Sequence, residues 1–356
     1  MAVGNLISVG LVCGLDLGDK KSYLCLCTAQ GEVLERGQVP TTASGLARRF
    51  SRSPVMRIAL EAGTHSPWVS RLLRQWGHEV LVANPRKVRL IGQSRRKNDR
   101  EDAQHLADLA SARPKLLFPI EHVSAQMQAD RGMLRCREAL VRSRSSLILH
   151  ARGLVKAMGG RLPSCSAATF AGKALAAVPE PLVVALGPVL EQIAQLSQTI
   201  RSYDRQLAEL LRTRYPQAQI LRQVPGVGPL TSLAYVLCLG DPSRFSKSRH
   251  VGAYLGLVPA QRDSGQTSPQ LPISKEGNPF LRRLLVQCAH YVLGRFGQDS
   301  DLRRFGERLA SQGGGKTPKK RAIVAVARKL SVVMHRLLVT SQEYQPLRRV
   351  ELQTAA

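Results

Sequence analysis

The chain has 356 residues and carries 52 lysine and arginine residues against 25 aspartate and glutamate residues, a formal net charge of +27. This excess indicates a polyanionic partner, of which nucleic acid is the commonest, while a hydrophobic content of 44% excludes a disordered basic protein. The aromatic content of 4% argues against a protein that reads single strands by stacking on many aromatic rings.

The length and the cysteines further limit the classes of protein to which the chain can belong. At about 150 residues per domain, the length predicts two or three domains. The apolar stretches fall short of the roughly 20 residues of a membrane span, and residues 1–10 lack the features of a signal peptide. The seven cysteines are scattered without a CxxC pair, which argues against a disulfide framework and a zinc ribbon. We therefore expect a cytoplasmic protein with no membrane partner.

The first hundred residues alternate predicted strands and helices. Apolar runs predict strands at residues 7–17, 22–28, 32–39, 55–60 and 79–83, and amphipathic segments predict helices at residues 42–50 and 67–76. Three meandering strands, followed by alternating helices and strands, are the element order of an RNase H-like α/β fold. This fold is therefore the prediction for the N-terminal domain.

Four acidic residues fall at informative places in this order. Asp16 ends the first predicted strand, Glu61 ends the fourth, and Asp99 and Asp102 lie three residues apart, on one face of a helix. In an RNase H-like fold these positions converge at one end of the sheet. Clustered carboxylates repel one another unless cations neutralise them, and two Mg²⁺ ions about 4 Å apart can clamp a phosphodiester. The alternative is that each acid is a helix cap or a surface charge.

Basic residues surround the Asp99 helix, and others follow on a long helical stretch at residues 124–159. A charge run is usually a solvated face, but beside a phosphodiester site it is better interpreted as a track for phosphates. The candidate nucleic-acid contacts in these two segments are Arg86, Lys87, Arg95, Arg96, Lys97, Arg135 and Arg142, with Arg131 and Arg152 on the same stretch. The histidines, among them His65 and His105, show no metal-ligand spacing and are interpreted as ordinary surface or core residues.

A heptad pattern occupies residues 189–210. Apolar side chains alternate at spacings of four and three, as in the seam of a coiled coil. The pattern predicts a coiled coil, either between chains or antiparallel, and the alternative is a helix packed on its own domain. The seam residues are Val189, Ile193, Leu196, Ile200, Tyr203, Leu207 and Leu210.

The last part of the chain, residues 219–347, is predicted to be mostly helical. Within it, Gly226 and Gly228 lie in a Val-Pro-Gly-Val-Gly-Pro segment that fits a helix-hairpin-helix turn, whose backbone N–H groups can hold a phosphate. The alternative is a turn between packed helices. Further on, Ser264 lies in a polar loop among basic residues, and from the residues alone it is simply a loop serine.

Together these motifs resemble the DEDD transposases of the IS110 insertion-sequence family, which are described as bridge-RNA-guided recombinases. The resemblance covers nearly the whole chain. Its N-terminal motifs are Gly14-Leu15-Asp16, Leu60-Glu61-Ala62-Gly63 and Lys97-Asn98-Asp99-Arg100-Glu101-Asp102-Ala103. Its C-terminal motifs are Val224-Pro225-Gly226-Val227-Gly228-Pro229, Gly256-Leu257-Val258-Pro259, Asp263-Ser264-Gly265, Ser274-Lys275-Glu276-Gly277-Asn278 and Ala325-Val326-Ala327-Arg328-Lys329-Leu330.

The resemblance implies a division into three parts. Residues 1–160 would form a RuvC-like DEDD domain that includes the arginine-rich helix, residues 161–218 a coiled-coil linker, and residues 219–356 a mostly α-helical transposase domain. By the same resemblance, Asp16, Glu61, Asp99 and Asp102 bind Mg²⁺, and Ser264 is the nucleophile that forms a covalent link to a DNA 5′ phosphate. Arg262 and Lys275 are further candidate phosphate contacts.

The resemblance also implies the partners. These are donor and target DNA, a bridge RNA encoded beside the gene, and further copies of the chain in a tetramer built as a dimer of dimers. The acids of one subunit would then act with the serine of another, in the bacterial cytoplasm at the nucleoid. The chain departs from the family at Asn98, where threonine is frequent, and at Asp263, where serine is frequent. The second departure places an acid beside the proposed nucleophile.

Three alternative functions are compatible with the sequence. The first is RNA-guided DNA transposition or recombination through a phosphoserine intermediate. The second is a Mg²⁺-dependent RuvC-like nuclease or Holliday-junction resolvase that uses the acids without a covalent serine step. The third is a basic scaffold that binds RNA or DNA without catalysis.

Overall fold

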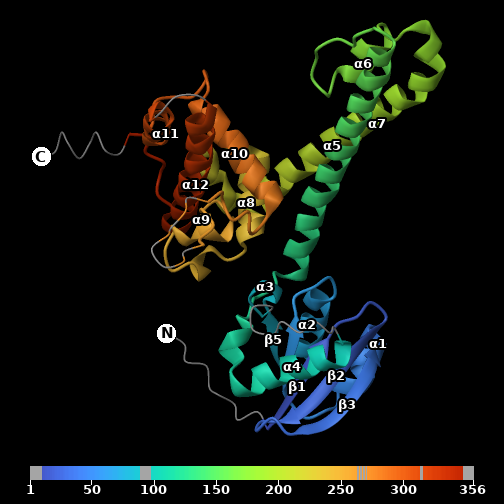
Figure 1. Cartoon of the computed structure of the whole chain (residues 1–356), viewed down its shortest axis with the longest axis vertical. Coiled ribbons are helices and arrows are strands. Elements are labelled where there is room, and N and C mark those ends of the chain that lie inside the picture. The colour runs from blue at the N-terminus through green and yellow to red at the C-terminus, as the bar shows by residue number, and fades with distance from the viewer. Residues whose placement is uncertain are drawn as a thin grey trace, which may run out of the picture. The chain divides into compact units, whose positions relative to one another are not determined.

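The computed structural model describes residues 10–88, 98–262, 264, 267, 269, 271–312 and 316–347. The chain forms two compact units, Met1–Ala125 and Gln126–Ala356 (Figure 1). The division by function at residues 160 and 218 stays a prediction. Within the described residues, no helix combines the length and the apolar character that a membrane crossing needs.

The first unit is built on a five-stranded mixed sheet with the order β3-β2-β1-β4-β5. Strands β1, β2 and β3 form an antiparallel meander, and β4 and β5 run parallel to β1. This arrangement agrees with the predicted RNase H-like fold. The strands are β1 (Leu11–Asp16), β2 (Lys21–Thr28), β3 (Val33–Pro40), β4 (Arg57–Glu61) and β5 (Glu79–Ala83).

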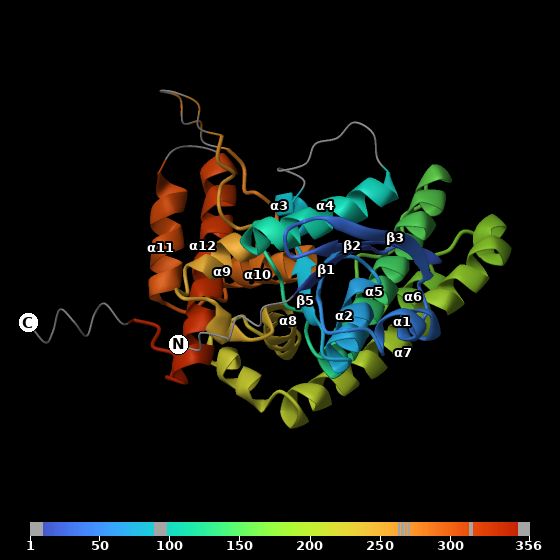
Figure 2. The same ribbon diagram turned by 90° about the horizontal axis from the view of Figure 1, so that it is seen from below.

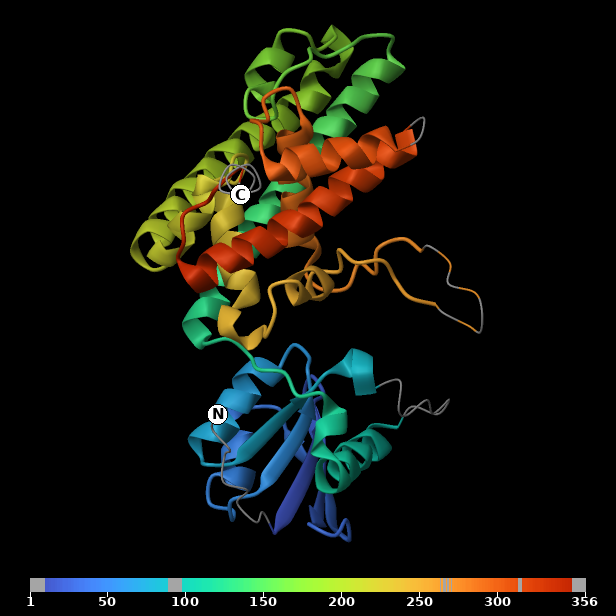
Figure 3. The same ribbon diagram turned by 90° about the vertical axis from the view of Figure 1, so that its left-hand side faces the viewer.

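Helices cover both faces of this sheet (Figure 3). Helices α1 (Ala43–Phe50) and α2 (Ser66–Gln75) pack on the face that carries Leu15 and Ile58. Helix α4 (Asp99–Ala112) packs on the opposite face, against β1, β2 and β4. Strand side chains alternate between faces, and both faces are covered, so the four central residues of β1 are all buried. Two short elements, α3 (Pro85–Val88) and η1 (Pro114–Leu117), complete the unit.

Helix α4 lies unusually close to strand β1. A Cβ atom on Gly14 would lie 1.9 Å from the carbonyl oxygen of Ala103 and 2.6 Å from the amide nitrogen of Ala107. No side chain fits at such distances, and the helix presents only alanines there, both fully buried. Glycine in β1 and alanine in α4 together allow the backbones of helix and sheet to touch.

The second unit begins with two long helices, α5 (Ala125–Ala157) and α7 (Val183–Thr213), which lie side by side and antiparallel (Figure 1). Arg137 forms an ion pair with Asp204 at 2.6 Å, and seven residues away on each helix the Arg144 guanidinium donates to the Ser197 hydroxyl at 3.2 Å. The short α6 (Phe170–Leu175) and η2 (Glu180–Leu182) lie between them in the sequence. Phe170 shares a buried cluster with residues of both long helices.

The heptad seam of α7 is buried within the chain. Ile193, Ile200 and Leu207 are almost fully buried, Leu196 and Leu210 are buried, and Val189 and Tyr203 are half-buried. Ile193 packs in one buried cluster with Ala151 and Val155 of α5, and Leu207 packs in another with Leu134 of α5. The alternative of a helix packed on its own domain accounts for this burial. A coiled coil between chains is not confirmed.

A buried carboxylate joins the start of α5 to the end of α7. Asp130 is only 2% exposed, and it accepts hydrogen bonds from Arg214 at 2.6 Å, Tyr215 at 2.6 Å and Gln126 at 3.1 Å. Burial by itself raises the pKa of Asp130, but the three hydrogen bonds outweigh it and the pKa lies below its usual value. The carboxylate therefore stays ionised and holds the two helix ends together.

The remaining helices form the rest of the second unit, which confirms that this part of the chain is mostly helical. Helix α8 is buried along its length, and α11 lies alongside α12 (Figure 2). The elements are η3 (Pro216–Gln223), α8 (Pro229–Leu239), η4 (Pro242–Arg244), α9 (His250–Tyr254), α10 (Pro279–Leu293), α11 (Asp301–Ser311) and α12 (Lys316–Thr340).

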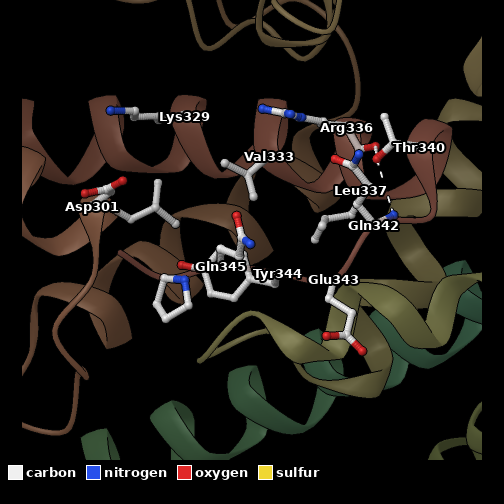
Figure 4. A pocket seen from close by; sticks show the side chains of 12 residues that line it. Asp301, Lys329, Val333, Arg336, Leu337, Thr340, Gln342, Glu343, Tyr344 and Gln345 are labelled. Atoms are coloured by element: carbon white, nitrogen blue, oxygen red, sulfur yellow. Dashed lines mark hydrogen bonds between the residues drawn. The ribbon is translucent and has the colours of Figure 1, made fainter. Parts of the chain in front are cut away.

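After α12 the chain reverses and runs back over the helices. Ser341 has a positive φ of 52°, and the Pro346 carbonyl accepts a hydrogen bond from the Asp301 amide at 2.7 Å. Figure 4 shows Tyr344 beneath Val333 and Leu337 of α12, beside a cavity of about 480 Å³. The Tyr344 amide donates to the Gln223 side chain at 2.7 Å, so the returning segment is anchored to η3 as well.

The contact at Gly14 gives a first prediction. In Gly14→Ala the added methyl group must push α4 away from β1, which should lower the free energy of unfolding by about 1–3 kcal/mol. Gly132→Ala is the control, because a Cβ at this α5 position meets nothing within 4 Å. The control should be neutral or stabilising. Urea denaturation of both variants measures the difference, and equal stabilities would contradict the close approach.

The Asp130 network gives a second prediction. The pKa of Asp130 is lower in the folded chain than in the unfolded chain, where it is about 3.9. The ionised carboxylate therefore stabilises the fold at pH values above the unfolded pKa, and this stabilisation is lost as the pH falls through the folded pKa. Asp130→Asn should therefore lower the unfolding free energy by about 1–3 kcal/mol at pH 7. Denaturation at several pH values should show the difference from the wild type shrinking below pH ~4.

The control is Asp299→Asn. Asp299 forms a solvent-exposed pair with Arg304, and such pairs contribute little. A similar loss of stability in both variants would contradict the role given to the buried network.

Candidate active site

Two of the four acidic residues end neighbouring parallel strands. Asp16 is the last residue of β1 and Glu61 the last residue of β4, and the register places Leu15 beside Leu60 just before them. Because the strands are parallel, their carboxyl ends meet at the same edge of the sheet. Both side chains are half-buried there.

The other two acids come from the first turn of α4. Asn98 precedes the helix and its side chain accepts a hydrogen bond from the Arg100 amide at 3.2 Å, which fixes where the helix begins. The N-terminal end of a helix favours negative charge, so Asp99 and Asp102 are stabilised by their place in it. Their spacing of three residues puts both on one face.

The structure brings these acids together. Asp16, Asp99 and Asp102 each offer a carboxylate oxygen, and these oxygens all lie within 4.8 Å of one another. Glu61 lines the same cleft, whose volume is about 460 Å³. Like charges at this distance repel, and the group offers only hard oxygen ligands. This donor set suits a divalent cation such as Mg²⁺ better than zinc, which prefers histidine and cysteine.

The cleft also contains His65, whose position in the sequence predicted an ordinary surface or core residue. His65 follows β4 by four residues and lines the cleft together with Asp19 and Thr64. The indole N–H of Trp68 donates to His65 Nδ1 at 3.1 Å, and His65 Nε2 lies 3.4 Å from an Asp19 oxygen. The spacing of His65 from the other histidines does not match that of metal ligands, so the sequence pattern did not mark it. Its place in the loop after Glu61, at the carboxyl edge of the sheet, was the available signal.

The basic residues near α4 are described only in part. Arg86 and Lys87 are exposed on α3, where Lys87 lies over the ring of Phe118 at 5.9 Å. Arg95, Arg96 and Lys97 lie outside the described residues. A phosphate track at this position therefore stays a prediction.

The arginines of α5 divide into two groups. Arg135 and Arg142 are exposed, and Arg142 forms an ion pair with Glu138 at 2.9 Å. Arg131 donates to the carbonyl oxygens of Leu237 and Cys238, and Arg152 donates to those of Leu162 and Pro163. The last two side chains therefore hold the fold together, which corrects the expectation that they belong to the nucleic-acid surface.

The turn before α8 contains Gly226 and Gly228. Gly226 has a positive φ of 88°, and a Cβ there would lie 2.7 Å from the ring of Tyr291, so packing alone explains the glycine. Gly228 is the N-cap of α8, and the preceding element η3 is a 3₁₀ helix. A helix-hairpin-helix is therefore not confirmed, and the alternative of a turn between packed elements suffices.

Ser264 lies on an extended arm between α9 and α10. Ser264 and Thr267 exchange backbone hydrogen bonds at 3.1 and 3.0 Å. Nearer the base of the arm, the Ala260 amide donates a hydrogen bond to the Pro272 carbonyl. Figure 3 shows this arm projecting from the helices of its unit. Ser264 and Arg262 are both exposed, whereas Asp263 lies outside the described residues.

The base of the arm is held by close backbone contacts. The Lys275 amide donates to the Gly256 carbonyl at 3.1 Å, and a Cβ on Gly256 would lie 2.2 Å from the Glu276 oxygen. Lys275 itself is exposed, with a positive φ of 56°. The structure thus places Arg262, Ser264 and Lys275 on one exposed segment.

Two family models match parts of this chain. Residues 13–159 match the family model of DEDD transposases of the IS110 type, and residues 218–305 match the transposase family IS116/IS110/IS902. The match to a DEDD transposase implies that the acidic cluster serves a divalent metal.

Three curated relatives align over most of their length. The transposase for insertion sequence element IS1328 from Yersinia enterocolitica is 32% identical, over 79% of this chain and 84% of the relative. A probable family 20 transposase from Pseudomonas aeruginosa is 30% identical, over 83% and 88%. The transposase for IS1111A from Coxiella burnetii is 28% identical, over 94% and 91%. With this extent of similarity and the carboxylate cleft in place, the chain belongs to the IS110 family of insertion-sequence transposases, which cleave and rejoin DNA.

Proposed function

We propose that the chain is an RNA-guided transposase that cuts and rejoins DNA through a covalent 5′-phosphoserine at Ser264. The observation that carries the proposal is the cluster of Asp16, Asp99 and Asp102, with Glu61 in the same cleft, in a chain that belongs to a family of transposases. The acids hold Mg²⁺, and the exposed arm supplies the nucleophile.

The carboxylates have one task, which is to hold cations beside a phosphodiester. Mg²⁺ in this cleft would neutralise the charge of the phosphate and stabilise the negative charge on the attacking and leaving oxygens. Asp16 and Glu61 are fixed by the sheet, and Asp99 and Asp102 by the first turn of α4. The four carboxylates are therefore held by two strands and one helix before any ligand arrives.

Ser264 has the exposure that a nucleophile for a macromolecular substrate needs. Its Oγ would attack the phosphorus atom, the bond from phosphorus to the 3′ oxygen would break, and that oxygen would leave with a proton. The serine proton passes to a base, for which Asp263 is a candidate in the sequence. Because a phosphodiester replaces a phosphodiester, the bond energy is kept and the strands can be rejoined without ATP.

The charge distribution supports polyanionic partners. Six of the candidate nucleic-acid contacts are exposed, namely Arg86, Lys87, Arg135, Arg142, Arg262 and Lys275. We assign these side chains to donor DNA, target DNA and a bridge RNA, in the bacterial cytoplasm at the nucleoid. Further copies of the chain, assembled as a tetramer, would let the acids of one subunit act with Ser264 of another.

The alternative is a Mg²⁺-dependent nuclease or Holliday-junction resolvase without a serine step. The same carboxylate cleft favours it, because two cations can activate water directly. The two mechanisms differ in whether protein becomes attached to DNA.

The role of the acids gives a third prediction. Asp102→Asn should reduce cleavage of DNA carrying the element's ends by at least about 10²-fold in the presence of the RNA. Binding of the same DNA, measured by fluorescence anisotropy, should stay equal or tighten, because the surface loses a negative charge. The control is Asp108→Asn, which changes an exposed acid on the same helix. Loss of binding together with cleavage would show that Asp102 is structural.

The role of Ser264 gives a fourth prediction. When the reaction is stopped with denaturant, wild-type protein should remain attached to a labelled 5′ end of cleaved DNA. Ser264→Ala should abolish this adduct, whereas Ser268→Ala, which removes a hydroxyl four residues away, should keep it.

Denaturing gel electrophoresis separates the outcomes. Cleaved DNA without attached protein would contradict the serine step and favour the nuclease. An adduct that persists in Ser264→Ala would place the nucleophile elsewhere. The absence of cleavage with RNA and Mg²⁺ supplied would favour the non-catalytic scaffold.

A further inference from the structure

His65 lies in the carboxylate cleft and has no part in the function proposed so far. It lines the cleft with Asp19 and Thr64, alongside the four acids. Its side chain is 28% exposed, so it is held by neighbours and yet reachable from solvent.

The neighbours of His65 fix which ring nitrogen carries the proton. The indole Nε1 of Trp68 lies 3.1 Å from His65 Nδ1. An indole N–H can only donate a hydrogen bond, so Nδ1 must be the acceptor and carry no proton. The proton of the neutral imidazole therefore lies on Nε2. The two rings stand nearly perpendicular, at 84°, with their centres 6.1 Å apart.

On its other side, His65 Nε2 faces the exposed side chain of Asp19. An Asp19 oxygen lies 3.4 Å away, which is long for a hydrogen bond, and the Asp19 side chain is 89% exposed. An exposed carboxylate at this distance can turn into solvent at little cost. The N–H of His65 can therefore be offered to another anion in the cleft.

A phosphate that enters this cleft needs hydrogen-bond donors. Asp16, Asp19, Glu61, Asp99 and Asp102 present acceptors, which repel phosphate oxygens wherever cations do not intervene. Among the side chains that the structure describes around the cleft, those that carry a hydrogen on nitrogen or oxygen at neutral pH are Thr64 and His65. Of these, the imidazole is the one held in place by a hydrogen bond from a neighbouring ring.

We propose that His65 Nε2–H donates a hydrogen bond to an oxygen of the DNA phosphate bound in the carboxylate cleft, which makes His65 a catalytic residue. Trp68 is a positioning residue, because it keeps Nδ1 unprotonated and so keeps the donor on Nε2. His65 retains its proton throughout, and no bond forms or breaks at the ring. The inference rests on the proposed function only in placing a DNA phosphate in this cleft.

The first test reads the tautomer and needs no activity. In the full chain labelled with ¹⁵N-histidine, the signals of His65 are those that disappear in His65→Gln. At a pH where the ring is neutral, they should report a protonated Nε2 and an unprotonated Nδ1. Trp68→Phe keeps an aromatic ring but lacks the N–H, so the tautomers should become mixed. A proton on Nδ1 in the wild type, or an unchanged spectrum in Trp68→Phe, would overturn the proposal.

The second test asks whether DNA reaches the donor. With Ca²⁺ in place of Mg²⁺, addition of duplex DNA with the RNA should shift the Nε2 signal of His65. The Nε2 signal of His290, an exposed residue of α10, is the reference and should move less. An unshifted His65 signal at saturating DNA would overturn the proposal, whether or not the chain cleaves DNA.

The third test is kinetic and gives the fifth prediction. In single-turnover cleavage, His65→Ala should lose about 10²-fold in rate with little change in DNA affinity. A loss of this size is typical when one hydrogen-bond donor to the charge that develops in the transition state is removed. His65→Gln should recover part of the rate, because its amide N–H can reach a similar position. His290→Ala should cleave as the wild type does. A wild-type rate in His65→Ala would overturn the proposal.

These tests separate the inference from the function on which it rests. If wild-type protein cleaves without a covalent adduct, the serine step fails, but the loss of rate in His65→Ala should persist. If the adduct forms normally in His65→Ala at the wild-type rate, the proposed function stands and the role of His65 is wrong.

Discussion

Helix α4 lies directly on strand β1, and its distance from the sheet determines the geometry of the acidic cleft. Gly14 and Ala103 leave no room between the two backbones, since even a methyl group on Gly14 would overlap the helix. Asp16 follows Gly14 by two residues in β1, and Asp102 directly precedes Ala103 in α4. The same contact that packs the helix therefore brings the two carboxylates together. A larger residue at position 14 would alter the packing and the site at once.

The positive charge of the chain serves two purposes, and the structure separates them. Arginines such as Arg131, Arg137 and Arg152 satisfy carbonyl oxygens or carboxylates inside the second unit. Arg135 and Arg142, on the same helix, are exposed. A net charge of +27 therefore overstates the surface available to nucleic acid, although it correctly indicates a polyanionic partner.

Much of the fold could be predicted from the sequence, because alternating apolar residues and turn residues mark strands directly. The acids of the cleft could be predicted as well, since the topology decides which strand ends meet. The partner of the α7 seam could not, because periodicity reveals an apolar face but not what covers it. His65 was missed for a related reason. Its significance depends on Trp68 and Asp19, and only the folded chain brings Asp19 to the loop that follows Glu61.

We propose that Asp16, Asp99 and Asp102, with Glu61 in the same cleft, form one divalent-cation site. Its most direct test is a crystal of the full chain grown with Mn²⁺, which scatters anomalously and accepts the same oxygen ligands as Mg²⁺. We expect an anomalous difference peak bounded by Asp16, Asp99 and Asp102, and its loss in Asp16→Asn. An empty cleft at saturating Mn²⁺, or a peak bound only by residues elsewhere in the chain, would contradict it.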